Sequence, residues 1–579
     1  MIRHLIRCAA VLAVVGLGAC SEKQLTVQNG NQGDTKRVLG TPQDAENLLG
    51  TYYKRWSSGV YGSTTDMEGM ANIMSLMNFS SLANNCQNSH YPFVNATNFN
   101  SPGNTCSGEQ FRLYSFQSEV ARVASDLLSR MADSGLTIGN TNPETDARNF
   151  RAKSFAEFLR GISLGYIALM HDSAGIISPK MGTGDECNAD PFTNVCRGKL
   201  KAYKEVMDSA LAAMQRSIEY ATKTGTTGSD GFPLPSGWIP SPTSYTADEF
   251  VKLVRSYRAR LRANVARTPA ERAAVDWDAV IADTKAGITA DNLITTSTTL
   301  GPGNSWRQQY ESYSTWHQMP AFIIGMADTS GSYAAWIAQP LGDRGSGKTP
   351  FFMITPDLRF PQGGTRAAQQ ADFAISSCAG ASQTCKRYFV NRATGGDNFD
   401  GPGWGWSNYD FVRFHSWQTK GDGSARNGNT IFMTKTEMDM LQAEGLYRQG
   451  KFAEAAALVN ITRKKNNLPE ITAFDATSPV PGGARGCVPK MPQGSTVTCG
   501  NLWEALKYEK RIETAYTHYA PWYLDERGWG DLPEGTPLYW AVPFQELQAR
   551  GTAIANLYGT GPGTGNAPNS SAGKSTYGW

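Results

Sequence analysis

The sequence predicts a mostly α-helical fold, a superhelix of helical hairpins that carries one large, loop-rich, irregular insertion. Apolar residues recur at spacings of three and four in many segments, which is the period of a helix with one buried face. Between residues 295 and 429 this period fades, and Gly, Pro, Trp and Tyr dominate. With 579 residues, 40% of them hydrophobic, the chain has enough apolar material for a large core.

The first twenty residues indicate export and a lipid anchor. Two arginines precede an apolar run that is too short to span a bilayer. The run ends in Leu17-Gly18-Ala19-Cys20, which resembles a bacterial lipobox, where the Cys is acylated and the chain is cleaved ahead of it. We therefore expect a lipoprotein signal peptide at 1–19, lipidation at Cys20 and a polar tether at 20–40. The alternative is an ordinary cleaved signal with Cys20 nearby by chance.

The other cysteines support export independently. Of the ten in the chain, Cys8 and Cys20 belong to the leader, and the remaining eight fall as neighbours in stretches rich in Gly, Asn, Pro and Ser. Local disulfides of this kind need an oxidising compartment. A metal site is disfavoured because no Cys-x-x-Cys occurs and the chain has only six His. The expected disulfides are Cys86–Cys106, Cys187–Cys196, Cys378–Cys385 and Cys487–Cys499.

Residues 41–294 are expected to form N-terminal helical repeats. Thr41-Pro42 is a favourable cap and first turn for the opening helix, TPQDAENLLGTYYKRW. The later segments indicate antiparallel helix pairs, with Ala and Gly where two helices approach closely. These segments are EQFRLYSFQSEVARVASDLLSRM, DARNFRAKSFAEFLRGISLGYIALMHDS, KAYKEVMDSALAAMQRSIEYATK, TADEFVKLVRSYRARLRANVAR and VDWDAVIADTKAGI.

Residues 295–429 are expected to form the loop-rich, aromatic insertion. Two turn-bounded runs in it, PFFMIT and KRYFVNR, are typical of extended chain. GDRGSGKTP resembles a phosphate loop only superficially, because it lacks the full spacing. DNFDGPG has two Asp that could hold Ca²⁺, but the EF-hand spacing is absent, and a solvated loop is the better interpretation.

Helical periodicity returns in residues 430–579, which we expect to hold a C-terminal repeat and a closing segment. Within this part, AEGLYRQGKFAEA resembles the turn of a tetratricopeptide unit, with small and aromatic residues on two helices that meet across Gly450. Together with the helix pairs before it, this motif predicts a tetratricopeptide-like curved stack that carries the insertion on one side. Residues 41–579 then form a single domain.

A charged helix followed by aromatic residues, YEKRIETAYTHYAPWYLDERGWGDLPEG, runs from Tyr508 to Gly535. Its carboxylates could act as general acid and base, but no orienting His or metal-ligand spacing accompanies them. We expect instead charge-assisted hydrogen bonds that hold the segment in place, with Trp and Tyr rings buried beneath it. The residues expected to have this structural role are Glu509, Arg511, Glu513, Asp525, Arg527 and Trp529.

These motifs, taken in order, resemble the RagB/SusD family of outer-membrane nutrient-binding lipoproteins over nearly the full length. TPQDAENLLGTYYKRW, SFAEFLRGISLGYIALMHDSAGI, YKEVMDSALAAMQRSI and EMDMLQAEGLYRQGKFAEAAALVNITRKKNNLP are similar to the family's helical repeats. The charged stretch matches the family's Glu, Arg, Glu and aromatic residues, followed by Asp, Arg and Trp-Gly. It departs from the pattern at Thr517-His518 and Pro521, and Arg550 stands where Asn is common.

The resemblance implies a non-catalytic protein, anchored in the outer membrane by lipid and facing the cell exterior. Such a protein binds oligosaccharide, or sometimes peptide, and delivers it to a SusC-like TonB-dependent transporter. No cofactor or metal is implied, and the formal charge of +3 is too small for a nucleic-acid surface. Two alternatives remain open: an exported glycoside hydrolase, and a helical-repeat structural adaptor that has no soluble ligand.

Ligand binding should use aromatic rings beside Asn, Asp and Arg, because sugars present apolar C–H faces and a rim of hydroxyls. Two segments of the insertion have this composition, although such rings can equally fill a core. GSTTDMEGMANIMSLMNFSS, with Asp66, Glu68 and Asn72, is a further candidate rim. The candidate ligand-binding residues are Trp306, Tyr310, Tyr313 and Trp316 in the first segment and Asp400, Trp404, Trp406, Asn408 and Tyr409 in the second.

Overall fold

The computed structural model describes residues 41–61, 67–80, 98–103, 107–133, 135–139, 146–179, 198–223, 231–296, 317–340, 343–344, 352–373, 385–392, 407–414, 428–493, 496–551 and 557–558. The predicted signal peptide, Cys20 and the tether lie outside these residues. The described chain is mostly helical with few, short strands, which confirms the predicted fold class.

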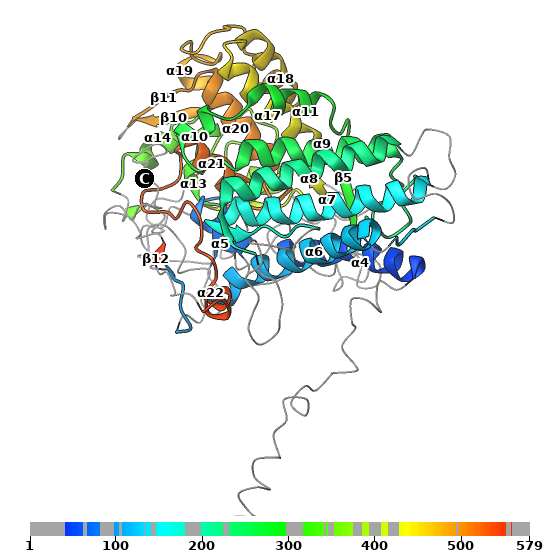
Figure 1. The fold of residues 1–579 in the computed structure, drawn as a ribbon. Helices are drawn as coiled ribbons and strands as arrows, with labels where there is room; N and C mark the ends of the chain where they lie inside the picture. Colours follow the sequence, from blue (N-terminus) through cyan, green and yellow to red (C-terminus); the bar gives the residue numbers. More distant parts are fainter. Residues whose placement is uncertain are drawn as a thin grey trace, which may run out of the picture.

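Long helices stack side by side through the N-terminal half of the described chain (Figure 1). They are α4 (Pro42–Tyr61), α6 (Ser107–Asp133), α7 (Ala147–Met170), α8 (Tyr203–Lys223) and α9 (Ala247–Asn264). Helix α7 packs against both α6 and α8, α4 packs against α6, and α8 packs against α9. Helices that are close in sequence are therefore close in space, as the predicted hairpins require.

Helix α7 lies within this stack, and nearly all of its side chains are buried. The Asp146 carboxylate caps it by accepting a hydrogen bond from the N–H of Arg148 at 2.9 Å. Two glycines then permit close packing of the neighbouring helices. A Cβ at Gly161 would lie 3.0 Å from the carbonyl oxygen of Ala210 in α8, and one at Gly165 would lie 2.5 Å from Cδ1 of Leu261 in α9.

A second group of helices forms the C-terminal repeat: α11 (Trp277–Lys285), α17 (Lys435–Arg448), α18 (Phe452–Lys465) and α20 (Leu502–Thr514). Helices α17 and α18 form a hairpin, and Gly450 adopts a φ of +74° in its turn, a conformation that favours glycine. Helix α20 packs against both of them, and α11 packs against α9 and α17. Helix α11 thus joins the two groups into one stack (Figure 1).

Two strands connect the insertion to the stack. Strand β5 (Asn292–Thr296) pairs antiparallel with β9 (Gly428–Met433), and Thr295 lies opposite Asn429. The chain therefore leaves the stack and returns to it at adjacent positions. This arrangement lets a long insertion sit on the helical scaffold without interrupting it.

The described part of the insertion consists of short elements. They are β6 (His317–Gln318), α13 (Ala321–Ile324), a 3₁₀ turn (Gly325–Ala327), α14 (Ser332–Ile337), α15 (Arg366–Asp372), β7 (Phe389–Asn391) and β8 (Tyr409–Phe411). The predicted extended run KRYFVNR contains β7, whereas residues 352–355 of PFFMIT form no strand. Apolar side chains of the insertion pack against α20 in one cluster, which includes Phe322, Phe389, Tyr508 and Ile512.

The closing segment returns along the stack. It contains α21 (Pro521–Trp529), which packs against α10 (Pro269–Ala273) and α5 (Met67–Met74), and α22 (Phe544–Ala549). Between these helices, Trp540 exchanges backbone hydrogen bonds with the end of α7, at Met170 and Asp172.

The remaining short elements are β1 (Phe79–Ser80), β2 (Asn98–Phe99), β3 (Ser173–Gly175), β4 (Leu200–Ala202), α19 (Gly483–Gly486), β10 (Lys490–Gln493), β11 (Thr496–Cys499) and β12 (Leu557–Tyr558).

Candidate functional site

The second aromatic segment is the connection of a β-hairpin. Strands β7 and β8 pair antiparallel, and the last residue of β7, Asn391, lies opposite the first residue of β8, Tyr409. Residues 392–408 therefore leave and re-enter the fold at one point. This connection joins two strands whose ends lie side by side. Asp400, Trp404 and Trp406 belong to it and lie outside the described residues.

Buried polar contacts hold the base of this hairpin. The N–H of Arg392 donates to the carbonyl oxygen of Asn408 at 2.8 Å. The Arg392 side chain, fully buried, donates to the carboxylate of Asp410 across the two strands, also at 2.8 Å. Beneath the strands, the rings of Phe360 and Phe389 stack with centroids 4.3 Å apart. The connection therefore departs from a fixed base.

The first aromatic segment ends beside the same hairpin. Trp306, Tyr310, Tyr313 and Trp316 precede β6 and lie outside the described residues. Directly after β6, Met319 donates its N–H to the carbonyl oxygen of Tyr409 at 3.2 Å. The carbonyl oxygen of Met319 accepts from the N–H and the hydroxyl of Ser407, at 3.0 and 2.7 Å. The structure thus brings the end of one predicted aromatic segment to the end of the other.

Two predicted ligand-binding residues are described, and both are buried. Asn408 is 6% exposed and Tyr409 is 0% exposed. The Tyr409 hydroxyl donates to Oε1 of Gln369 at 2.8 Å and accepts from the N–H of Met353 at 3.1 Å. Burial raises the pKa of Tyr409, so its phenol stays neutral. Tyr409 therefore fixes the base of the hairpin, and its ring is not available to stack on a ligand.

The candidate rim at residues 66–72 is also corrected by the structure. Every residue of α5 is buried, including Glu68 and Asn72, which are 2% and 0% exposed. The helix packs against α6 and α21, so Glu68 and Asn72 face the interior together with the methionines around them. Asp66 lies outside the described residues.

The charged helix α20 lies in an ion-pair network inside the protein. Glu509 and Glu513 both contact Arg359 of the insertion, with N–O distances of 2.8 and 3.2 Å, and all three are buried. Burial raises the pKa of Glu509 despite Arg359. Burial acts in the same direction on Glu513, but Arg413 and Arg359 outweigh it and hold the pKa of Glu513 below its usual value. Such buried carboxylates join two parts of the fold and offer no surface to a substrate.

The rest of this network lies between α20 and α21. Arg511 contacts Glu526 at 3.0 Å and Asp531 at 2.7 Å, while Asp525 contacts Lys510 at 2.7 Å. The Arg527 guanidinium donates charge-assisted hydrogen bonds to the backbone carbonyl oxygens of Leu538 and Asn264. Trp529 is 9% exposed, and its indole N–H donates to Glu444. Sequence reasoning missed Arg359, Glu444, Glu526 and Asp531, and also Arg272, which contacts Glu444 at 2.6 Å and Asp525 at 3.2 Å.

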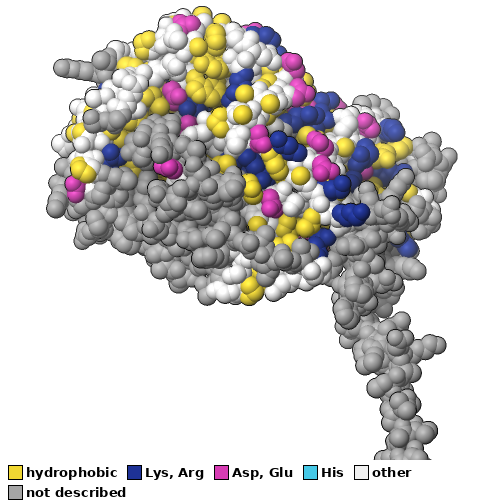
Figure 2. Space-filling view, turned by 60° about the vertical axis from the view of Figure 1, so that its left-hand side comes forward, with side chains coloured by type: hydrophobic (Ala, Val, Ile, Leu, Met, Phe, Trp, Pro, Cys, Tyr) yellow, Lys and Arg dark blue, Asp and Glu magenta, His cyan; other side chains and the backbone are white. Residues whose placement is uncertain are grey.

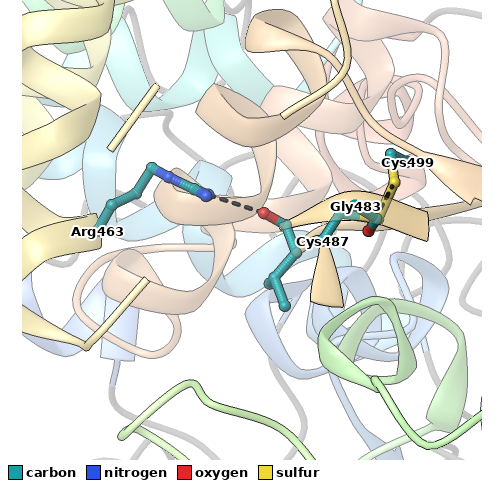
Figure 3. Close-up of a disulfide and its surroundings, with 5 residues drawn as sticks. Arg463, Gly483, Cys487 and Cys499 are labelled. Carbon is teal, nitrogen blue, oxygen red and sulfur yellow. Dashed lines mark hydrogen bonds between the residues drawn. A yellow bond between two sulfur atoms is a disulfide. The ribbon is translucent and has the colours of Figure 1, made fainter. Parts of the chain in front are cut away.

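One of the expected disulfides lies within the described residues. Cys487 and Cys499 are bonded, with 5.7 Å between their Cα atoms, and they tie the start of the β10–β11 hairpin (Figure 3). Arg463 of α18 donates a hydrogen bond to the carbonyl oxygen of Val488, the residue after Cys487, at 2.8 Å. Cys385 is also disulfide-bonded, and its expected partner Cys378 lies outside the described residues, as do Cys86, Cys106, Cys187 and Cys196.

The described surface carries no strong single-sign face in the view of Figure 2, where Lys and Arg alternate with Asp, Glu and apolar side chains. Among the described helices, none is long and apolar enough to cross a membrane. The described residues also contain no group of three or more His, Cys, Asp and Glu arranged to hold a metal ion.

This architecture has counterparts among solved structures. No protein-family model matches the sequence, and no curated protein matches it. Among solved structures, a SusD homolog from Bacteroides thetaiotaomicron VPI-5482 has a TM-score of 0.54 and 13% identity, over 91% of this chain and 98% of that chain. A SusD superfamily protein from Parabacteroides distasonis ATCC 8503 has a TM-score of 0.52 and 9% identity, over 88% and 98%.

At these identities the likeness concerns the fold. It extends over nearly the whole of both solved chains and most of this chain. The chain therefore has the SusD fold, and the resemblance that its motifs predict is confirmed at that level.

Proposed function

We propose that this chain is a non-catalytic, lipid-anchored binding protein of the RagB/SusD type, which captures oligosaccharide, or peptide, outside the cell. It would pass the ligand to a SusC-like TonB-dependent transporter in the outer membrane. The observation that carries this proposal is the meeting of the two aromatic segments at Met319, Ser407 and Tyr409, on a SusD-like scaffold. A rigid base from which two aromatic segments depart suits recognition of sugar faces by rings.

Binding is tested with the protein lacking residues 1–20 on an array of glycans and peptides. The double variant Trp404→Ala with Trp406→Ala should lose retention of whatever ligand the array selects, while its melting temperature changes little. The matched control is Phe474→Ala, since Phe474 is an aromatic residue that is 52% exposed and lies outside the insertion. If the double variant unfolds at much lower temperature, the two rings belong to the core instead.

The lipid anchor is tested separately in cells. The variant Cys20→Ala should move the protein from the membrane fraction to the soluble fraction, because acylation needs the thiol and several acyl chains give stable anchoring. Retention of this variant in the membrane fraction would contradict the lipobox interpretation.

A further inference from the structure

A cavity of about 540 Å³ lies on the helical stack, away from the aromatic segments. Its walls come from the first turns of α8, the end of α9, helix α10 and the turn that follows α10. Every residue that lines it is among the described residues. Its volume is within the roughly 300–1,000 Å³ of small-molecule sites.

The cavity exists because small side chains stand where the three helices diverge. Ala266, Ala270 and Ala274 line it on one side, and none of them can fill the space in front of α8. On the other side, Met207 and Leu211 provide an apolar wall. Met207 is 2% exposed and belongs to the main core cluster, so this apolar wall is continuous with the core.

The cationic side chains at the rim already have acidic partners. Lys204 contacts Glu271 at 3.0 Å, and Arg262 contacts Asp283 at 3.3 Å. Glu271 also accepts hydrogen bonds from the hydroxyl of Tyr203 and the N–H of Arg267. Asp283, however, is shared with Arg255 and Arg258, so Arg262 is only partly neutralised, whereas Lys204 has Glu271 as a full counter-ion.

Two acidic side chains at the rim, by contrast, have no ion-pair partner among the described residues. Asp208 and Asp276 both line the cavity and are exposed, and neither has a Lys, Arg or His partner among the described residues. One oxygen of Asp276 accepts from the N–H of Ala279 as the N-cap of α11, which leaves the other oxygen for a ligand. The cavity thus combines an apolar wall with two carboxylates that form no ion pair among the described residues.

We propose that this cavity binds a small organic cation, an ammonium or guanidinium group carried on an apolar body. The body lies against Met207, Leu211 and the alanines, and the cation lies between Asp208 and Asp276. An apolar body alone would leave the two carboxylates without a partner, and an anion would meet repulsion from them. The site does not depend on the proposed nutrient binding, because no residue of the insertion lines it.

The test uses phenethylammonium as the probe, with 2-phenylethanol as its neutral analogue and 3-phenylpropionate as its anionic one. Binding to the protein lacking residues 1–20 is measured by ligand-observed NMR titration. We expect saturable binding of the cation, binding of the neutral analogue that is weaker by roughly fivefold or more, and none of the anion. Equal binding of the cation and the neutral analogue, or no saturable binding, would overturn the proposal.

Two variants locate the site. Asp208→Asn with Asp276→Asn should weaken binding of the cation by about tenfold, and Asn at 276 still caps α11. The matched control is Asp44→Asn with Asp248→Asn, two exposed acids in first turns of helices, which should bind like the wild type. Ala270→Leu fills the cavity from an exposed position and should abolish binding without lowering the melting temperature. Unchanged binding by the Asp208/Asp276 variant would also overturn the proposal.

Discussion

Ser407 donates two hydrogen bonds to the carbonyl oxygen of Met319, one from its N–H at 3.0 Å and one from its hydroxyl at 2.7 Å. Met319 stands directly after β6, and Ser407 stands two residues before β8. Both residues are buried. This pair connects two segments that are far apart in sequence and both rich in Trp and Tyr, and it gives them a common base. The proposed ligand face depends on that base.

Arg359 is expected to be essential for stability. It contacts Asp357, Glu509 and Glu513 at 2.7 to 3.2 Å, and none of the four is more than 1% exposed. Arg359→Met should lower the free energy of unfolding by about 3–5 kcal/mol, since it removes the nearest cation from three buried carboxylates. Urea denaturation measures this loss. Arg55→Met is the control: Arg55 and Glu119 are each 40% exposed, and their pair should contribute about 1 kcal/mol or less.

His171 should make the stability of the protein depend on pH. It is fully buried, its Nδ1 contacts the carbonyl oxygen of Ala541 at 3.0 Å, and its Nε2 has no hydrogen-bond partner among the described residues. Burial lowers the pKa of His171 from 6.5 to about 4. Between these values the unfolded chain binds a proton and the folded protein does not. The contribution of neutral His171 to stability is therefore fully present above the pKa of the unfolded chain and is lost as pH falls from 6.5 towards 4.

The variant His171→Gln isolates this effect. Between pH 7 and pH 5 the free energy of unfolding of the wild type should fall by about 2 kcal/mol more than that of the variant, because the pKa shift of His171 is linked to folding. Denaturation of both proteins at the two pH values gives this difference in the free energy of unfolding. The contributions of all other groups cancel, because these groups titrate in both proteins. Parallel pH profiles for the two proteins would show that His171 does not titrate as proposed.

The Cys487–Cys499 disulfide should stabilise the fold modestly, because its ring is short. Its sequence separation is 12, for which the loss of unfolded-chain entropy corresponds to about 2–3 kcal/mol. Cys487→Ala with Cys499→Ala should show this loss in urea denaturation under oxidising conditions. Under strong reductant the variant and the wild type should become equally stable. A difference that persists under reductant would come from packing of Cys487 instead.

Trp529 should contribute to stability and not to ligand binding. It is 9% exposed, and the Lys510 ammonium and the Arg511 guanidinium lie 5.4 and 5.1 Å from its ring centroid. Trp529→Ala should lower the free energy of unfolding by about 3–5 kcal/mol, as truncation of a buried aromatic side chain. The folded fraction should keep the affinity of the wild type for its ligand. A lower affinity in that fraction would place Trp529 near the binding face.

The helical stack could be predicted from the sequence because its signal is local. Periods of three and four, a Pro after a capping Thr, and Gly at close approaches all act within one or two helices. Short elements gave no such signal. Helix α5 is buried on every side, so its polar Glu68 and Asn72 suggested an exposed rim, and only its packing between α6 and α21 shows otherwise.

The ion-pair partners of Glu509 and Glu513 could not be predicted, because they come from distant parts of the chain. Burial of Glu509 and Glu513 depends on Arg359, which no spacing in the sequence relates to them. Tyr409 presents the same difficulty: both strands of its hairpin are buried on both faces, so no alternation of apolar and polar residues marks the inward side. The aromatic composition of the sequence predicted the segment, but only the strand pairing in the structure shows where its base lies.

The central claim, that this chain captures a nutrient and leaves it intact, is tested most directly by recovering the ligand after binding. A glycan or peptide selected on the array is titrated into the soluble protein by calorimetry, and the mixture is then separated by size and its mass measured. The account predicts saturable binding and recovery of the ligand at its original length. Shortened products would identify a hydrolase, and the absence of binding to any glycan or peptide would contradict the account.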